Sequence, residues 1–526
     1  MNTIHILDCT LRDGGYCNEW RFGLDNIKRI ISGLVEANVE IIECGFLTNK
    51  YEYKSNTTLF NSVEEIASVI PENRQGKIFV AMVNYGEYDV DRLPARDSSS
   101  IDGLRVAFHK KNRHAALEFC KRVREKGYLV FVQAMVSLSY TDDEFLDTIR
   151  CVNDINPYSF YIVDSFGMMK EKDLTRLFYM IEHNLNPDIW IGFHSHNNMQ
   201  LAYSNAQKLT MVQTNRNLIV DSSIYGMGRG AGNLNTELFV EYLNENCGKD
   251  YRLKPILTII DEIINAFYQR NYWGYSLPNY ISASHNAHPN YASYLNDKNT
   301  LTYEDMNNIF DMMDEEKRVS YDKAYIEDLY LQYMALGNEN EAHKAELYKC
   351  ISGKTVVLIA PGKSSTDERD LILGYPNKGV VYISVNFSYP ECNTDFIFVS
   401  NLRRFNELAE TYKSNCIVTS NISDNNVYYK TKYGDLLNAE EAVADNAGLM
   451  AIRFLINFGA KRIMLAGFDG YSFDARENYG NSDMAFVTKR NLLEAMNLGM
   501  TKVLTEYRKM IDIQFLTTPK HVLFRS

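Results

Sequence analysis

The amino-acid sequence predicts an α/β protein with two sheets. A closed TIM (β/α)₈ barrel is followed by a short helical linker region and then by a Rossmann-like open α/β domain. At 526 residues the chain is longer than one hydrophobic core can serve, and strand-like runs alternate with helical segments in both halves. We therefore predict a barrel at 1–275, a helical linker or insert at 276–348 and the second domain at 349–526.

Eight short runs rich in β-branched residues predict the barrel strands. Between them lie segments such as NIKRIISGLVEA and AALEFCKRVREKG, whose apolar residues recur at helical spacing. Strands that alternate with helices form a parallel sheet, and eight is the number that closes a barrel, whereas an open doubly wound sheet is the alternative. The runs are 4–10, 39–46, 77–84, 102–108, 128–136, 159–167, 189–196 and 218–226.

The pattern changes after Trp273. Residues 276–348 are rich in Asn, Tyr and His and then become charged with helical periodicity, which predicts the linker. A second alternation of strands and helices follows from Gly353. Its predicted strands lie in the runs 355–365, 380–387, 395–404, 416–422 and 462–470.

Composition and charge exclude several function classes. The formal net charge of -12 argues against a nucleic-acid partner, and no run of 18 apolar residues predicts a membrane span. The first residues lack the basic and apolar regions of a secretory signal, and the nine cysteines include no C-x-x-C pair. These features predict a cytoplasmic protein with reduced thiols.

Two histidines at the end of the seventh predicted strand indicate a metal site. In a strand, residues two apart point to the same face, so His194 and His196 project together. Asp13 follows the first predicted strand, where barrels place their chemistry. One carboxylate and two imidazoles suit a divalent cation, with Mn²⁺ as our first expectation and Mg²⁺ or Co²⁺ as alternatives.

Three separated motifs resemble those of the DRE-TIM metallolyase family. DCTLRDGG at 8–15, HSHNN at 194–198 and GMGRGAGNLNTE at 226–237 occur in that family's order. The family includes 4-hydroxy-2-oxovalerate aldolase, hydroxymethylglutaryl-CoA lyase, and the isopropylmalate and homocitrate synthases. The resemblance covers about residues 3–240 and implies a barrel that makes or breaks carbon–carbon bonds beside a keto group.

The resemblance also implies roles for single residues. Asp13, His194 and His196 would ligate the cation, with Asn233 as a further ligand. Arg12 would reach the carbonyl oxygen of a bound 2-oxo acid. Glu43 and Asp164, which end predicted strands, would support the site or simply cap the strands. Arg229 would fix the glycine loop.

The proton-transfer group departs from the family pattern. Pyruvate aldolases carry a histidine just after the D-G of the first motif, and this chain has Tyr16 there. The substitutes weighed are Tyr16, Cys17, Glu19, His285 and His288, and a phenol would need strong tuning to act as a base.

The family's branches suggest several functions. The synthases carry D-G-E-Q where this chain has Gly15 and Tyr16, and the coenzyme A lyase carries a glycine-loop cysteine that GMGRGAGN lacks. We therefore expect an aldolase that acts through a metal-bound enolate of pyruvate or a similar 2-oxo acid with an aldehyde partner. An acyl-CoA-dependent Claisen synthase is an alternative. Family members commonly form homodimers, which we expect here.

The second domain carries a weaker signal. APGKSS at 360–365 makes a glycine turn after a strand, where open α/β sheets bind phosphates, but it lacks the first glycine of a P-loop. The wider pattern resembles the sialyltransferase-like and pterin-pyrophosphokinase-like domains of surface-glycan and flagellar glycosylation proteins. This implies a nucleotide or nucleotide-sugar near Gly362, Ser364, Asn401 and Asp469. Arg403 would either reach a phosphate or form a solvated charge pair.

Three arrangements of the two domains remain open. In the first, the second domain holds a nucleotide-linked substrate from which the barrel makes a sugar for a surface glycan. In the second, it performs a separate glycosyl- or nucleotidyl-type transfer. In the third, it is a regulatory binding module without catalysis.

Overall fold

A computed structural model describes residues 3–298, 300–337, 343–481, 484 and 490–521. The chain forms two compact units. The first comprises Met1–Ala292 with Asp314–Tyr321, and the second comprises Ser293–Met313 with Asp322–Ser526.

The first unit is the predicted eight-stranded barrel. Its strands pair in the order β1-β9-β8-β7-β6-β5-β4-β2, every pair is parallel, and the pairing of β1 with β2 closes the ring. A further short strand, β3 (Leu59–Phe60), pairs with β2. The barrel strands are β1 Ile4–Asp8, β2 Ile41–Leu47, β4 Ile78–Asn84, β5 Gly103–Phe108, β6 Leu129–Ala134, β7 Ser159–Asp164, β8 Trp190–Ser195 and β9 Leu218–Ser222.

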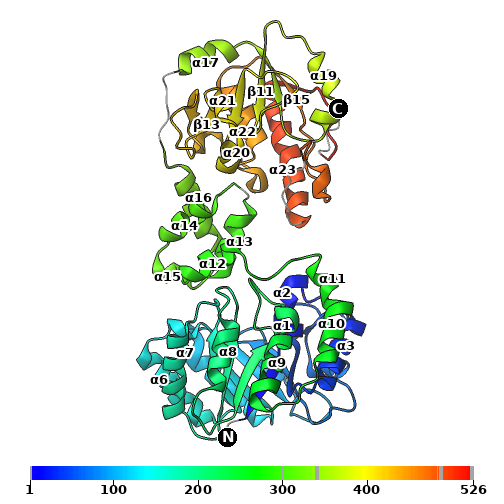
Figure 1. Cartoon of the computed structure of the whole chain (residues 1–526), viewed down its shortest axis with the longest axis vertical. Coiled ribbons are helices and arrows are strands. Elements are labelled where there is room, and N and C mark those ends of the chain that lie inside the picture. Colours follow the sequence, from blue (N-terminus) through cyan, green and yellow to red (C-terminus); the bar gives the residue numbers. More distant parts are fainter. Residues whose placement is uncertain (1–2, 299, 338–342, 482–483, 485–489, 522–526) are drawn as a thin grey trace. The chain divides into compact units, whose positions relative to one another are not determined.

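Amphipathic helices surround these strands (Figure 1). In α3 (Leu24–Glu36), for example, Ile27, Ile30, Ile31 and Leu34 are buried, which is the spacing of one helical face. The other helices of this layer are α5 Arg113–Glu125, α6 Asp142–Ile155, α7 Glu171–Asn184, α8 Ala202–Thr210, α9 Thr236–Cys247 and α10 Leu253–Ile259.

A second apolar layer fills the inside of the barrel. It contains Leu7, Ile41, Val80, Phe131 and Tyr161, which come from different strands and are fully buried. Bulky side chains from several strands close the interior of a TIM barrel, so its chemistry takes place at the carboxyl ends of the strands.

The second unit contains an open parallel sheet of seven strands in the order β14-β13-β12-β11-β10-β15-β16. Five of these strands fall within the predicted runs, whereas β14 and β16 were not predicted. The strands are β10 Thr355–Ile359, β11 Val380–Val385, β12 Phe396–Val399, β13 Cys416–Thr419, β14 Tyr429–Thr431, β15 Arg462–Ala466 and β16 Asp512–Phe515. Helices of this unit include α20 Leu402–Glu407, α22 Ala447–Asn457 and α23 Arg490–Arg508.

The stretch predicted as a linker is helical, and its residues are shared between the two units. Its helices are α12 Leu277–Ser284, α13 Pro289–Asp297, α14 Tyr303–Asp311, α15 Glu315–Arg318, α16 Lys323–Met334 and α17 Lys344–Ile351. In the described part of the chain, no helix combines the length and the apolar character that crossing a membrane requires.

Candidate metal centre

The loop after β1 positions Asp13. The chain leaves β1 at Asp8 and turns at once into α1 (Thr10–Asp13), because the Asp8 carboxylate accepts the Thr10 backbone N–H at 3.0 Å. The other Asp8 oxygen accepts the Thr236 hydroxyl at 2.8 Å, which ties this turn to the loop that follows β9. Asp13 is thereby held in the buried interior of the barrel mouth.

His194 and His196 lie on one face at the end of β8, as their spacing predicts. Both are buried, and their ring centroids are 5.1 Å apart with an interplanar angle of 86°. His196 forms an antiparallel bridge with Asn233, so the glycine loop after β9 folds back over the end of β8.

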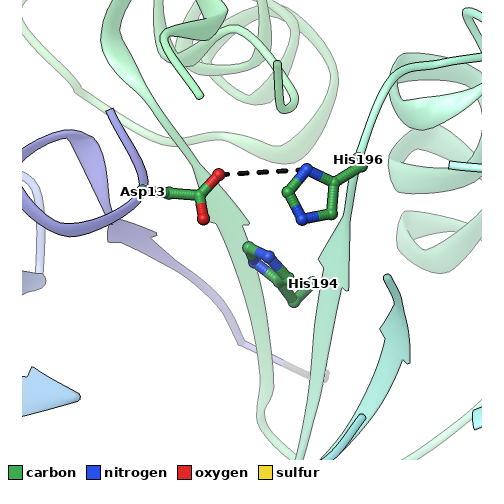
Figure 2. Close-up of side chains that lie close together, drawn as sticks. All are labelled: Asp13, His194 and His196. Atoms are coloured by element: carbon green, nitrogen blue, oxygen red, sulfur yellow. Dashed lines mark ion pairs between the residues drawn. The ribbon is translucent and has the colours of Figure 1, made fainter. Parts of the chain in front are cut away.

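Asp13, His194 and His196 form one buried cluster (Figure 2). Their ligating atoms all lie within 4.8 Å of one another. The His196 Nδ1 atom is 3.8 Å from the Asp13 Oδ2 atom, which also accepts the Asn233 amide at 2.7 Å. The structure thus brings the three predicted ligands and Asn233 to one point.

A buried network of charged residues supports this cluster. Arg105 on β5 is 0% exposed and donates to Glu43 at 2.7 Å and to Asp221. Glu43 in turn accepts Arg12 Nε at 2.9 Å, and Asp221 lies 2.9 Å from His194 Nδ1. A carboxylate behind a histidine fixes the ring and leaves its other nitrogen for a metal.

Neither Arg105 nor Asp221 was predicted as a site residue. The signal was present in part, because each is a charged residue inside an otherwise apolar strand, in GLRVAF and LIVDS. A buried charge needs a partner, but the sequence does not say which strand across the barrel provides it.

Two further observations show that the residues fit a divalent cation. Arg12 Nη2, His196 Nδ1 and Asn233 Oδ1 are buried, and none has a hydrogen-bond partner among the described residues. Gly228 faces the same spot, since a Cβ there would lie 2.3 Å from Asn233 Nδ2 and 2.6 Å from Asp13 Oδ2. These polar atoms surround a space free of side chains. A bound ion and its ligand would supply the partners that the atoms lack.

The electrostatics keep Asp13 and His196 free of protons. Burial opposes the charge of Asp13, but the charges of Arg12, His196 and His194 outweigh it and hold the pKa of Asp13 well below its usual range. Burial lowers the pKa of His196 to about 3, against the opposing charge of Asp13. Metal ligands must be deprotonated, so little competition from protons is expected at neutral pH.

The predicted supporting residues have different surroundings. Glu43 belongs to the network described above, whereas Asp164 accepts the backbone N–H groups of Met168 and Met169 at 3.0 and 3.1 Å and so caps the loop after β7. Burial raises the pKa of Asp164 to about 7. Arg229 donates to the Ser165 carbonyl at 3.2 Å, which anchors the glycine loop to the β7 loop.

Tyr16 contacts Trp20 and the glycine-loop residue Arg229. Its ring makes an edge contact with Trp20 at 4.8 Å and faces the Arg229 guanidinium at 5.7 Å, and 42% of its surface is exposed. Desolvation raises the pKa of Tyr16, so the phenol keeps its proton at neutral pH. Neighbouring Cys17 donates to the Gly228 carbonyl, and burial raises its pKa to about 12.

The two candidate histidines after α12 have different environments. His285 ends α12, and its Nδ1 atom lies 2.9 Å from the Ile281 carbonyl oxygen. His288 packs edge-on to Phe166 of the β7 loop at 5.7 Å. Burial lowers the pKa of His288 to about 3, and the charges of Arg229, His109 and His196 add to this. The charges that act on His288 thus include that of His196, one of the predicted metal ligands.

Hydrogen bonding indicates the form of the His288 ring. Its Nδ1 atom accepts the Asn290 backbone N–H at 3.2 Å, and a neutral imidazole that accepts at one nitrogen carries its proton on the other. His288 therefore presents an Nε2–H donor at neutral pH.

Comparison with known proteins finds relatives of the barrel region. Residues 3–259 match the HMGL-like family. We call this matched region the HMGL-like domain, after the family that it resembles. The 4-hydroxy-2-oxovalerate aldolase of Pseudoalteromonas translucida is 26% identical over 271 residues, which are 50% of this chain and 75% of that protein. The enzyme of the same name from Geobacillus genomosp. 3 is 29% identical over 245 residues, 46% of this chain and 70% of that protein.

A solved structure also resembles the HMGL-like domain. The N-terminal domain of a candidate aldolase from Bacteroides vulgatus has 25% identity and a TM-score of 0.49, and the alignment covers 57% of this chain and 98% of that one. All three matches involve about half of this chain. The predicted resemblance of the second domain to glycosylation proteins stays a prediction.

The residues predicted to bind a nucleotide lie at the carboxyl edge of the second sheet. Gly362 follows β10, and its N–H donates to the Gly467 carbonyl at 3.2 Å. Asp469 accepts the Ser364 N–H at 2.7 Å, while the Ser364 hydroxyl pairs with Thr517. Asn401 caps α20 by accepting the Arg403 N–H at 3.0 Å. The Arg403 guanidinium lies 5.3 Å from the centre of the Tyr303 ring.

Proposed function

We propose that the HMGL-like domain is a divalent-metal-dependent carbon–carbon lyase of the aldolase type, with a 2-oxo acid and an aldehyde as its ligands. The buried cluster of Asp13, His194 and His196, with the unpartnered Arg12 Nη2 beside it, carries this proposal. The curated relatives named above, 26% and 29% identical, support the same reaction class.

The cation would be held by Asp13, His194 and His196, with Asn233 beside them. A divalent ion acts as a Lewis acid on a carbonyl oxygen and so stabilises the negative charge that develops when a bond to the neighbouring carbon breaks or forms. We keep Mn²⁺ as the first expectation and Mg²⁺ and Co²⁺ as alternatives, because mixed histidine and carboxylate ligation suits all three.

Arg12 would bind the 2-oxo acid. Its Nε and Nη1 atoms are engaged by Glu43 and Asp13, so the guanidinium is fixed and Nη2 is the donor left for a ligand oxygen. A donor that is already oriented needs no reorganisation during the reaction, and the loss of one such donor typically costs about 10²–10³ in rate.

Tyr16 and His288 would donate the proton that the aldehyde oxygen takes up during condensation. In the condensation direction the new carbon–carbon bond turns the aldehyde oxygen into an alkoxide, which must take up a proton. Both residues keep a proton at neutral pH, Tyr16 through its raised pKa and His288 through its Nε2–H. In the cleavage direction the same groups would first have to accept the proton of the substrate hydroxyl.

Cleavage of 4-hydroxy-2-oxovalerate tests the proposal. The bond between C3 and C4 breaks, the C4 hydroxyl loses its proton as acetaldehyde forms, and C3 gains a proton to give pyruvate, which lactate dehydrogenase and NADH report. We expect activity with Mn²⁺ that disappears with chelator and in His194→Ala.

A second assay does not depend on the aldehyde. Pyruvate incubated with the protein and Mn²⁺ in D₂O should exchange its methyl protons, as read by mass spectrometry after the metal is removed. His114→Ala is the matched control, because the exposed His114 and the half-buried Asp147 and Cys151 form a second cluster that could also hold a metal. Absence of exchange, or loss of exchange in His114→Ala but not in His194→Ala, would refute the assignment.

A further inference from the structure

A large cavity opens in the second unit at the carboxyl edge of its sheet. Its volume is about 790 Å³, within the range of about 300–1,000 Å³ that ligand pockets occupy. Residues that follow β10, β11, β12 and β15 line it, together with the first residues of α22. The cavity therefore occupies the edge at which open parallel sheets bind their ligands.

The strand order places the cavity at a switch point. From β10 the chain continues to β11 and then outward to β14, whereas β15 lies on the other side of β10. Loops that leave β10 and β15 consequently run in opposite directions, and the space between them is where doubly wound sheets bind ligands.

Glycines allow the backbones of these two loops to lie in direct contact. The Gly362 N–H donates to the Gly467 carbonyl at 3.2 Å, and a Cβ on Gly362 would lie 2.2 Å from that oxygen. Gly467 adopts a φ of +71°, and a Cβ there would lie 2.0 Å from the Ala360 carbonyl oxygen. The approach of the loops thus depends on glycine at both positions.

Asp469 offers an unused acceptor to this cavity. It is 1% exposed and lines the cavity wall. Its Oδ2 atom accepts the Ser364 N–H at 2.7 Å, but its Oδ1 atom has no hydrogen-bond partner among the described residues. A buried carboxylate oxygen without a donor is costly, and a ligand hydroxyl would supply the missing hydrogen bond. A vicinal diol, as in ribose, is the chemistry that suits it.

The amino end of α22 offers donors beside Asp469. Asn446 caps this 11-residue helix by accepting the Leu449 N–H at 3.2 Å, and the Tyr471 hydroxyl accepts the Asn446 amide at 3.0 Å. Ala447 and Gly448, in the first turn, line the cavity, and their N–H groups have no partner within the helix. A Cβ on Gly448 would lie 2.8 Å from the Phe468 ring, next in sequence to Asp469.

We propose that this cavity binds a nucleotide. The ribose hydroxyls would donate to Asp469, and a phosphate would accept from the first turn of α22, where the helix dipole favours an anion. Tyr471 and Lys298 also line the cavity, and they would supply an aromatic ring for the base and a positive charge. This inference concerns the second unit and does not rest on the lyase chemistry proposed for the HMGL-like domain.

Calorimetric titration of the full chain with ADP, GDP, UDP and CDP tests the proposal. We expect at least one of them to bind with a Kd below about 1 mM and to raise the Tm. Asp469→Asn, which keeps the size of the side chain, should weaken that binding about 10-fold or more, as expected for a lost hydrogen bond to a charged group. Asp370→Asn is the control, because the Asp370 side chain is 95% exposed and lies outside the cavity lining.

Two further experiments test the phosphate and ribose contacts and provide a second variant. Orthophosphate and D-ribose at 10 mM should each compete weakly, because each would occupy only half of the site. Tyr471→Phe removes the hydroxyl that holds Asn446 and should also weaken nucleotide binding, which keeps the test decisive if Asp469→Asn does not fold. Binding of none of the four nucleotides, equal affinity in the folded Asp469→Asn variant, or orthophosphate binding as tight as nucleotide would overturn the proposal. Nucleotide binding without lyase activity would refute only the proposed function.

Discussion

Replacement of Arg105 by methionine is the sharpest test of how the metal centre is built. Arg105 is the only residue in the described network that touches both Glu43 and Asp221, and these two carboxylates hold Arg12 and His194. Methionine is of similar length and apolar, so the variant removes the charge and leaves the barrel interior filled.

The expected stability loss follows from the burial. All three side chains are at most 1% exposed, so Glu43 and Asp221 cannot replace the lost guanidinium with bulk water. Breaking a buried ion pair by removing one partner typically costs about 3–5 kcal/mol, and each carboxylate here keeps one other partner. We therefore expect a loss of about 3 kcal/mol in the free energy of unfolding, measured by urea denaturation at pH 7.

Mn²⁺ affinity distinguishes a role of Arg105 in positioning the metal ligands from a role in stability alone. Loss of a residue that orients a metal ligand typically costs about 10–100-fold in affinity, so Arg105→Met should weaken Mn²⁺ binding by that factor in calorimetry. Arg216→Met is the matched control, because Arg216 is also buried but binds Glu182 and backbone carbonyls. It should lower stability without changing Mn²⁺ affinity. Equal Mn²⁺ affinity in Arg105→Met and the wild type would refute the positioning role.

Three other changes probe the barrel mouth. Gly228→Ala should weaken Mn²⁺ binding at least about 10-fold in calorimetry and lower the Tm, because its Cβ would displace Asp13 and Asn233. Unchanged affinity would contradict the placement of the ion. Tyr16→Phe should slow condensation about 10²-fold without changing Mn²⁺ affinity, and unaltered kinetics would remove Tyr16 from proton transfer. Burial lowers the pKa of His288 to about 3, so its stabilising effect is present above pH 6.5 and is lost on acidification. Between pH 7 and 5 the wild type should therefore lose about 2 kcal/mol more stability than His288→Gln, and equal losses in urea denaturation would contradict this.

The sequence predicted the barrel better than the second sheet for a physical reason. Each barrel strand is buried on both faces and therefore reads as a near-continuous apolar run, as in IIECGFL of β2. The unpredicted strands are short and polar: β14 is YKT and β16 is DIQF. A strand of three or four residues at a sheet edge owes its conformation to its neighbours, which a local pattern does not show.

The candidate metal centre was predictable to the extent that it is local in sequence. The H-x-H spacing places two imidazoles on one face, and the barrel count brings Asp13 to the same mouth. The network behind them is not local, since Arg105 lies 62 residues from Glu43 and 116 from Asp221. The choice between His285 and His288 likewise depends on how the turn after α12 packs against Phe166, which their spacing of three residues does not determine.

The charges of the network favour a divalent cation with a monoanionic ligand. Arg12 and Arg105 carry two positive charges, and the three carboxylates linked to them, Asp13, Glu43 and Asp221, carry three negative ones. Buried charge is costly unless it is balanced, and this set is one positive charge short. A divalent cation leaves an excess of one positive charge, which the carboxylate of a 2-oxo acid neutralises. The same reasoning predicts that pyruvate binds more tightly when Mn²⁺ is present, whereas its uncharged amide does not, and calorimetry with the two ligands distinguishes them. Equal enhancement for both would mean that the metal site does not select its ligand by charge.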